Sequence, residues 1–154
     1  MQKNMPKLYN ASYTTVTWET STLRKWLNND FLNSAFSANE KAMIPTVTVS
    51  ADKNPDYSTN PGNATQDKVF LLSITEVNKY FNFNSARRCE PTDYAVANGA
   101  WKNDSGNCYW WLRSPGYNQD CAALVIYDGR VSEGGTCVDV DNRSVRPALW
   151  IDLS

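Results

Sequence analysis

The chain has 154 residues, of which 20% are charged, and it carries a formal net charge of −1 and no histidine. This length is typical of one domain with one hydrophobic core. The nearly balanced charge excludes the clustered basic excess of a nucleic-acid binder, and the lack of histidine excludes the usual general base, the Ser-His and Cys-His nucleophile pairs and most zinc sites.

The first part of the chain predicts a helix. Residues 13–18 are rich in β-branched and aromatic side chains, which favours either a strand or an extended lead-in. Ser21 or Thr20 is a good N-cap for the helix that follows, whose apolar residues fall three and four apart: Leu23, Trp26 and Leu27. We expect a break at the polar residues 28–30, beyond which the apolar face continues with Phe31, Leu32 and Phe36.

Two further helix starts are marked by capping boxes, in which a serine is followed three residues later by a glutamate. They run from Ser37 to Glu40 and from Ser73 to Glu76, each ahead of apolar spacing. Between them, residues 50–67 are rich in Pro, Gly, Asn, Asp and Ser and predict a loop. Residues 68–72 have the continuous apolar character of a short buried strand.

The second half of the chain predicts strands after one short helix. That helix covers residues 92–98 and is closed by Gly99. Residues 122–127 and 130–132 are expected to pair as a hairpin, because the Asp128-Gly129 dipeptide between them is favoured in tight turns.

A second turn is predicted at residues 133–135, followed by a strand at 136–140 and a last strand at 145–152. Helices early and a meander of strands late are typical of an α+β domain. No internal repeat and no linker mark a second domain.

Two blocks rich in aromatic residues and proline, residues 109–116 and 145–151, enclose a segment of different character. In that segment, small and β-branched residues alternate with polar and tyrosine residues, which indicates a scaffold interleaved with a display surface. Residues 117–144 contain five acidic and two basic side chains, a local net charge of −3 that would repel phosphate backbones. We expect core roles for three tryptophans of the blocks, and pairing with carboxylates or carbonyls for two arginines: Trp110, Trp111, Trp150, Arg113 and Arg146.

The four cysteines fit no CxxC metal or redox pattern: Cys89, Cys108, Cys121 and Cys137. Three disulfide pairings are possible, and free thiols are favoured because two of the four fall in the segment that looks variable.

The sequence contains no run of about 18 apolar residues, so no membrane insertion is expected. The start Met1 to Asn4 lacks the apolar core of a secretion signal. We expect a protein that stays inside its cell or particle, or a domain of a longer protein on a phage particle or bacterial cell surface.

Four ordered motifs resemble those of an uncharacterised domain family of bacteria and phages. They are Trp18 to Asn28, Val69 to Ser73, Trp110 to Gly116 and Val145 to Trp150. The terminal pattern is similar to that of C-type-lectin-like folds, which include formylglycine-generating enzymes and the variable proteins of diversity-generating retroelements. The resemblance implies a C-type-lectin-like α+β fold, with early helices packed under a late antiparallel sheet. It also implies that residues 1–154 form one domain, the C-terminal part of a longer family architecture.

In those retroelements, adenine-directed mutagenic reverse transcription rewrites Asn codons near the 3′ end of the gene. The resemblance places the variable segment at residues 117–143. Changing only the first two bases of an AAC codon yields Tyr, Asp, Cys, Ile, Arg, Ser, Thr, Val, Leu or Gly, among others, which covers most residues between the scaffold positions. Gln119 and Glu133 do not fit, because their codons end in purines, and Ser144 stands where the family usually has Gly.

Composition and resemblance together predict a ligand-binding display domain, of receptor or adhesin type, whose partner is a protein or a cell-surface molecule. Tyrosines would supply rigid contact area, and charged residues would fix the orientation of the partner through polar contacts. The expected ligand-binding residues are Tyr117, Asn118, Asp120, Leu124, Ile126, Tyr127, Asp128, Arg130, Ser132, Glu133, Thr136, Asp139, Asp141, Asn142 and Arg143. No catalytic residue, metal or cofactor is expected.

Two alternative functions are open. Residues 90–92 and 101–104 resemble, with different spacing, the Glu-Pro-Asn and Trp-Asn-Asp elements of calcium-dependent sugar-binding lectins. An enzyme related to formylglycine-generating enzymes would need a positioned cysteine pair, and no cysteine here lies in a matching motif. The fallback for an enzyme is the carboxylate pair Asp139 and Asp141, which is more simply the wet face of a strand.

Overall fold

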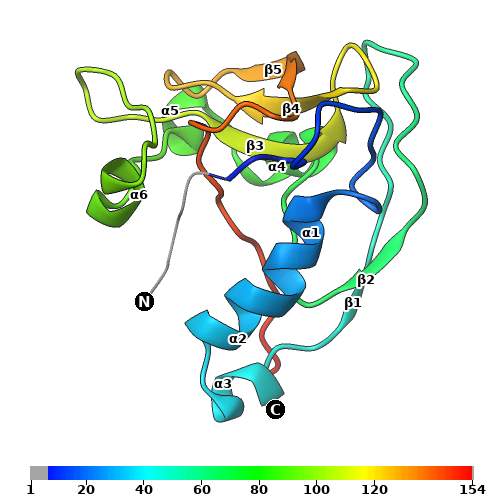
Figure 1. Ribbon diagram of the computed structural model, residues 1–154, viewed down its shortest axis with the longest axis vertical. Helices are drawn as coiled ribbons and strands as arrows, with labels where there is room; N and C mark the ends of the chain where they lie inside the picture. The colour runs from blue at the N-terminus through cyan, green and yellow to red at the C-terminus, as the bar shows by residue number, and fades with distance from the viewer. Residues whose placement is uncertain (1–6, 154) are drawn as a thin grey trace.

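The computed structural model describes residues 7–153, in which helices come first and the main antiparallel sheet comes last, so the α+β prediction is confirmed. The early helices lie below the three-stranded sheet in Figure 1, and a two-stranded sheet lies beside them. No helix within residues 7–153 is both long enough and apolar enough to cross a membrane. The start Met1 to Asn4 lies outside the described residues.

The first helical run is continuous. Ser21 caps α1 (Thr22–Trp26) by accepting a hydrogen bond from the Arg24 backbone N–H, and α1 leads directly into a π-helical turn, η1 (Leu27–Phe31), and then α2 (Leu32–Ala35). The predicted break at residues 28–30 is therefore wrong, because the polar residues there sit in the π-helical turn instead of ending the helix.

Tertiary contacts compensate for the weak helix propensity of these polar residues. The Asn28 side chain accepts hydrogen bonds from the backbone N–H groups of Lys68 and Val69 at 2.8 and 3.1 Å, and it donates to the Val69 carbonyl at 2.8 Å. Apolar residues four apart turn the other face of the run into the core: Leu23, Leu27 and Phe31.

Both predicted capping boxes are confirmed, at the starts of α3 (Ala38–Ala42) and α4 (Ile74–Tyr80). In each, the serine side chain accepts from the backbone N–H three residues on, and the glutamate at that position accepts from the serine N–H. These reciprocal bonds satisfy two donors that a helix N-terminus leaves free.

Two short helices precede the main sheet. They are α5 (Asn84–Arg87) and α6 (Asp93–Ala97), and Thr92 caps the second through its side chain. Gly99 follows with a φ of 97°, so the predicted helix and its glycine end are confirmed.

Part of the predicted loop at residues 50–67 is a strand. Its last residues form β2 (Thr65–Asp67), which pairs antiparallel with β1 (Val47–Val49). Residues 13–18 form bends and turns without a strand, so the strand alternative for them was wrong.

Residues 68–72 and 145–152 are not the strands that the sequence predicted. They meet at one bridge, in which Phe70 and Ala148 exchange both backbone hydrogen bonds, at 2.9 and 2.8 Å. The pairing does not extend toward the start of the first segment, because the N–H groups before Phe70 donate to the Asn28 side chain.

The main sheet has three antiparallel strands in the order β3 (Trp110–Pro115), β4 (Cys121–Val125) and β5 (Val131–Cys137). The hairpin predicted around Asp128-Gly129 joins β4 to β5 and is confirmed. Strand β4 lies in the middle, between two neighbours, and β5 lies at the edge.

The second turn predicted at residues 133–135 is wrong, because β5 runs through these residues. The extra residues form a bulge between the pairs Ala122–Thr136 and Leu124–Ser132. A Cβ on Gly135, which has a φ of 64°, would lie 1.8 Å from the Ala122 carbonyl oxygen, so this position needs glycine.

Both faces of the sheet are covered. Alternate residues of β4 point to opposite faces, as they must in any strand. On one face, α1 and η1 contribute to a cluster that includes Leu23, Leu27, Trp111, Ala122 and Leu124. On the other, α4 contributes to a cluster with Ile74, Val77, Trp110, Leu112, Ala123 and Val125. The early helices therefore cover only one face, and α4 covers the second.

Arg113 of β3 joins the sheet to α4 through a buried charge. Its side chain is 2% exposed and pairs with the carboxylate of Glu76, and its guanidinium also donates to the carbonyls of Leu71 at 2.9 Å and Ser50 at 3.1 Å. Asp52 is a second acidic neighbour at 3.4 Å. The predicted pairing of Arg113 with carboxylates and carbonyls is confirmed.

The tryptophan prediction is confirmed for two of three positions. Trp110 and Trp111 are 1% and 0% exposed, whereas Trp150 is 56% exposed because the segment that carries it does not join the sheet. Arg146 lies between the rings of Phe81 and Trp110, 5.0 Å from each ring centroid. Arg146 thus has a structural role, as expected, but its guanidinium packs against aromatic rings instead of pairing with a carboxylate.

We predict that Trp111→Ala lowers the free energy of unfolding by about 3–5 kcal/mol, because it empties a fully buried aromatic site. The matched control is Trp150→Ala, which removes the same side chain from an exposed position and should change stability by less than about 0.5 kcal/mol. Urea unfolding followed by circular dichroism measures both, and equal losses would contradict the assignment of the core.

Candidate functional site

Strand β4 offers no surface position to a partner. Leu124 is 3% exposed and lies opposite Trp111 on β3, so its predicted ligand-binding role is wrong. It does point away from Val125, as the strand periodicity required. That side, however, holds the hydrophobic cluster of Leu23, Leu27 and Trp111 and not solvent.

The tip of the β4–β5 hairpin is fixed against α5. The Ile126 N–H donates to the Arg130 carbonyl at 2.9 Å and closes the turn. Gly129 has a φ of 90°, and a Cβ on it would lie 1.8 Å from the Asn84 carbonyl oxygen. The turn therefore needs glycine both for its conformation and for its close contact with α5.

A charged pair stands on this tip. The Asp128 carboxylate accepts from the Arg130 N–H at 3.0 Å and from its Nε at 2.7 Å, and the Arg130 side chain is 65% exposed. Slight burial opposes ionisation of Asp128, but the hydrogen bonds and charge of Arg130 outweigh it and lower the pKa of the carboxyl. This ion pair therefore holds two opposite charges in a fixed arrangement at the solvent-exposed tip.

Beside the tip lies a group that we call the tip cluster: Trp101, Tyr109, Tyr127 and Arg143. The centroids of its three rings are 5.0 to 5.7 Å apart, and the guanidinium of Arg143 lies 4.3 Å from the centroid of Tyr109. All four side chains are partly exposed. Two of them, Tyr127 and Arg143, are predicted site residues.

The Arg143 side chain is partly buried within the tip cluster. Its Nη1 donates to the Asn142 side chain at 2.6 Å, and its Nε is buried and has no partner in the described structure. Desolvation lowers the pKa of Arg143, and Tyr109 opposes that shift. Because Nε is shielded from solvent, a partner would meet Arg143 through the exposed part of its side chain, which the Tyr109 ring holds in place.

Three exposed tyrosines gather at the opposite end of the hairpin, and we call them the tyrosine end: Tyr13, Tyr57 and Tyr117. The rings of Tyr57 and Tyr117 are 6.4 Å apart. A hydrogen bond with Asp120 raises the pKa of Tyr13 to about 12, and one with Cys121 raises the pKa of Tyr117. The predicted residues here are Tyr117, Asn118 and Asp120, of which the first two are exposed.

The remaining predicted residues connect the two ends. Ser132, Glu133 and Thr136 are half-buried along the edge strand β5. Asp139 and Asp141 are exposed in turns after β5 ends, so they do not share the face of a strand as predicted.

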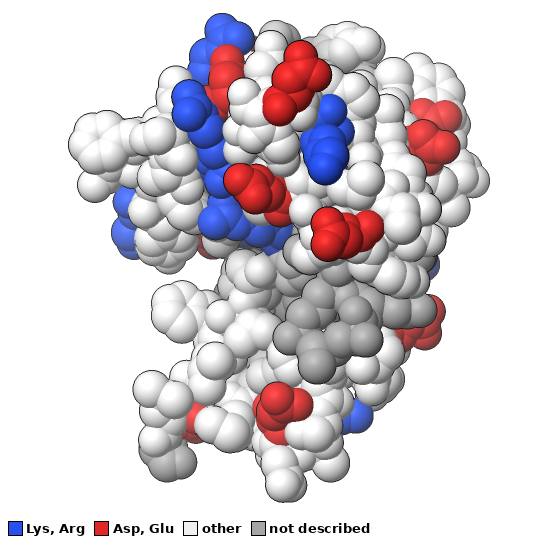
Figure 2. Space-filling model, turned by 90° about the vertical axis from the view of Figure 1, so that its left-hand side faces the viewer, with Lys and Arg blue, Asp and Glu red and all other residues white. Residues whose placement is uncertain are grey.

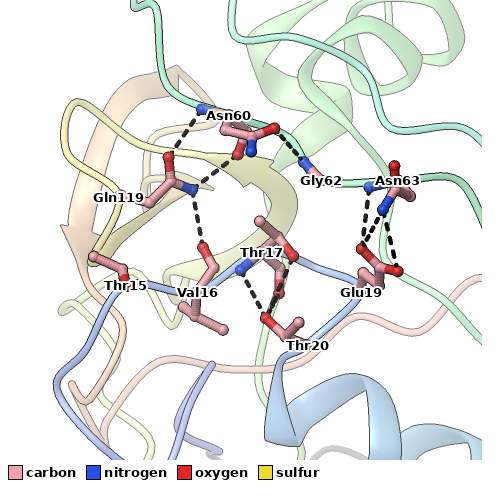
Figure 3. A pocket seen from close by; sticks show the side chains of 9 residues that line it. All are labelled: Thr15, Val16, Thr17, Glu19, Thr20, Asn60, Gly62, Asn63 and Gln119. Atoms are coloured by element: carbon pink, nitrogen blue, oxygen red, sulfur yellow. Dashed lines mark hydrogen bonds between the residues drawn. The ribbon is translucent and has the colours of Figure 1, made fainter.

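A polar pocket lies next to this surface without including any predicted site residue (Figure 3). Its volume is about 360 Å³, and it is lined by Thr15, Val16, Thr17, Glu19, Thr20, Asn60, Gly62, Asn63 and Gln119. The Gln119 amide donates to the carbonyls of Val16 at 3.1 Å and Asn60 at 2.8 Å, and it accepts from the Asn60 N–H at 2.9 Å. The Glu19 carboxylate accepts hydrogen bonds from the backbone N–H and from the side-chain amide of Asn63. The walls of the pocket thus bond mainly to one another.

Figure 2 shows the face that carries α5, α6 and the hairpin tip. Basic and acidic side chains lie next to one another over its upper part, and its lower part carries few charges. A partner on this face would meet charges of both signs, which favours defined orientation over general attraction. Within residues 7–153 no group of three or more Cys, Asp or Glu side chains is placed to hold a metal ion.

A family model described as "Domain of unknown function (DUF6273)" matches residues 1–153. The chain belongs to this family. Comparison with curated proteins and comparison with solved structures each gave no match. The family match covers every element of the site, from the N-terminal segment to the turns after β5.

The predicted segment omits four members of the site: Tyr13, Tyr57, Trp101 and Tyr109. The last three each pack against a tyrosine within that segment, and Tyr13 hydrogen-bonds to Asp120 within it. No local pattern marks them, because their partners are 18 or more residues away along the chain. Their aromatic character was the only available signal.

Proposed function

We propose that this DUF6273 domain is a C-type-lectin-like display module that binds a protein or cell-surface partner through its hairpin surface. That surface comprises the tyrosine end, the edge strand β5 and the tip cluster with the adjoining Asp128–Arg130 pair. The partner would bury the aromatic rings, and the charged groups would determine its orientation on the surface.

The observation that carries the proposal is the tip cluster. Trp, Tyr and Arg are the residue types that dominate binding energy at protein interfaces. Here they lie together, partly exposed, beside a hairpin turn that Gly129 allows to pack closely against α5. A preorganised group of this kind loses little conformational entropy on binding.

The separation of scaffold and surface supports the finer part of the proposal, a variable protein of a diversity-generating retroelement. Tyr109 and Val131 pack against the hydrophobic clusters, but the other side chains named on the hairpin surface are not part of them. Every residue of β3 and β4, in contrast, is buried. Substitutions at the surface would then change the partner without changing the backbone.

The direct test of binding uses the double variant Tyr127→Ala/Arg130→Ala. The labelled domain is titrated against a panel of intact bacterial cells and against a glycan array. We expect the variant to bind about tenfold or more weakly to any target of the wild type, because two contact side chains are lost.

The matched control is Lys79→Ala/Tyr80→Ala, which removes one tyrosine and one basic residue from exposed positions on α4. It should bind as the wild type does. Equal binding by all three proteins would contradict this surface, and binding that a calcium chelator abolishes would support the lectin alternative instead.

The retroelement origin is tested in the genome. We expect a reverse transcriptase gene nearby, with a near-identical, Asn-rich repeat of the coding segment for residues 110–150. Sequences from related isolates should then differ at adenines of that repeat, and a locus that lacks it would restrict the proposal to an ordinary adhesin.

A further inference from the structure

The four cysteines lie in two facing pairs, although all four are free thiols in the structure. Cys121 on β4 and Cys137 on β5 occupy directly opposite positions of the hairpin. Cys89 and Cys108 form the second pair, which a backbone hydrogen bond brings together.

The first pair has the backbone geometry of a cross-strand disulfide. The Val138 N–H donates to the Asp120 carbonyl at 3.0 Å, whereas the Cys121 N–H and carbonyl bond to Asn118 and Gly116. Cys121 and Cys137 are therefore a pair without mutual backbone hydrogen bonds. Opposite residues of that kind have Cα atoms about 4.5 Å apart, which lies within the range of roughly 4.4–6.8 Å found across disulfides.

The second pair is held by two hydrogen bonds. The Cys108 backbone N–H donates to the Cys89 carbonyl at 2.9 Å, and the Cys108 Sγ donates to the same oxygen at 3.2 Å. The two thiols are close enough for each to shift the pKa of the other.

The thiols of the second pair are chemically unequal. The neighbouring Cys108 thiol lowers the pKa of Cys89 to about 7 against the effect of burial, and the charge of Arg146 lowers it further. The Cys89 thiol and burial raise the pKa of Cys108. Cys89 is partly exposed and Cys108 is buried, so Cys89 is the nucleophile that an external reagent meets first.

We propose that the domain has two disulfide-forming sites, Cys89–Cys108 and Cys121–Cys137, which close when it meets a low-molecular-weight disulfide such as oxidised glutathione. The Cys89 thiolate attacks one sulfur of that disulfide, forms a mixed disulfide and releases one thiolate. Cys108 then loses its proton, attacks the Cys89 sulfur and expels the second thiolate. Two protein thiols are oxidised, and one small disulfide is reduced to two thiols.

The hairpin pair follows the same exchange more slowly. Burial, followed by a hydrogen bond with Asp120, raises the pKa of Cys121 to about 12. The partly exposed Cys137 therefore forms the mixed disulfide, and Cys121 resolves it. The order of closure is Cys89–Cys108 first and Cys121–Cys137 second.

The two bonds would brace both ends of the proposed binding surface. A Cys89–Cys108 bond closes the segment that carries α6 and Trp101 of the tip cluster. A Cys121–Cys137 bond ties β4 to β5 beside the tyrosine end, where the thiol of Cys121 contacts Tyr117. The disulfide chemistry itself does not depend on the proposed binding function.

The test incubates the full, reduced chain in glutathione buffers of increasing oxidised fraction. Free thiols are blocked at successive times, and the disulfides are mapped by mass spectrometry of an unreduced digest. We expect two pairings, 89–108 before 121–137, and a melting temperature that rises by roughly 6–12 °C for each bond.

Two double variants isolate the sites. Cys89→Ser/Cys108→Ser should keep only the hairpin disulfide, and Cys121→Ser/Cys137→Ser should keep only the other. Crossed pairings, persistent glutathione adducts or four thiols that stay free in every buffer would overturn the proposal. Bonds that form without raising the melting temperature would overturn the bracing effect, whatever the outcome of the binding tests.

Discussion

Strand β4 has a hydrophobic cluster against each of its faces, and none of its five side chains is exposed. The other features of the domain depend on this burial. An antiparallel strand usually shows one face to water, so a second covering layer has to be supplied. Helix α4 supplies it, and the buried charge of Arg113 holds α4 to β3 through Glu76. Burying that charge is tolerable only because carboxylates and carbonyls surround it.

Because β4 and the edge strand β3 are fully buried, the proposed partner surface is confined to the other edge strand and to the two ends of the hairpin. That other edge is β5, and the tip cluster and tyrosine end flank it. This arrangement differs from a simple alternation of scaffold and display residues along every strand. In the proposed display module, the exchangeable side chains would lie where a substitution costs little packing, and the tryptophan-bearing strand β3 would stay unchanged.

Local signals in the sequence predicted local structure well. The capping boxes at Ser37 and Ser73, the Thr92 cap with Gly99, and the Asp128-Gly129 turn are all present, because each depends on contacts within a few residues. The errors arose where distant groups take over backbone hydrogen bonds. The Asn28 side chain accepts hydrogen bonds from the N–H groups of Lys68 and Val69, so these two donors are not free to pair with another strand. No sequence pattern around Asn28 or at residues 68–72 indicates that the two segments are in contact.

The same limit applies to the site. Leu124 satisfied both the codon pattern and the strand parity, but parity cannot tell solvent from a second core. In contrast, two residues that departed from the expected variable pattern have structural contacts. Gln119 bonds three segments together, and Ser144 exchanges backbone hydrogen bonds with β3 and its preceding residue while its own side chain is buried. Their positions explain why they need not follow the composition of the surface around them.

The most direct test of this account compares two libraries by protease resistance on a cell-surface display. One library randomises five exposed positions: Tyr117, Asn118, Arg130, Asp139 and Asp141. The other randomises the five positions of β4, Cys121–Val125. We expect most members of the first library to keep the protease resistance of the wild type and nearly all members of the second to lose it. Equal losses in the two libraries would show that the surface residues are part of what holds the fold, and would contradict the account.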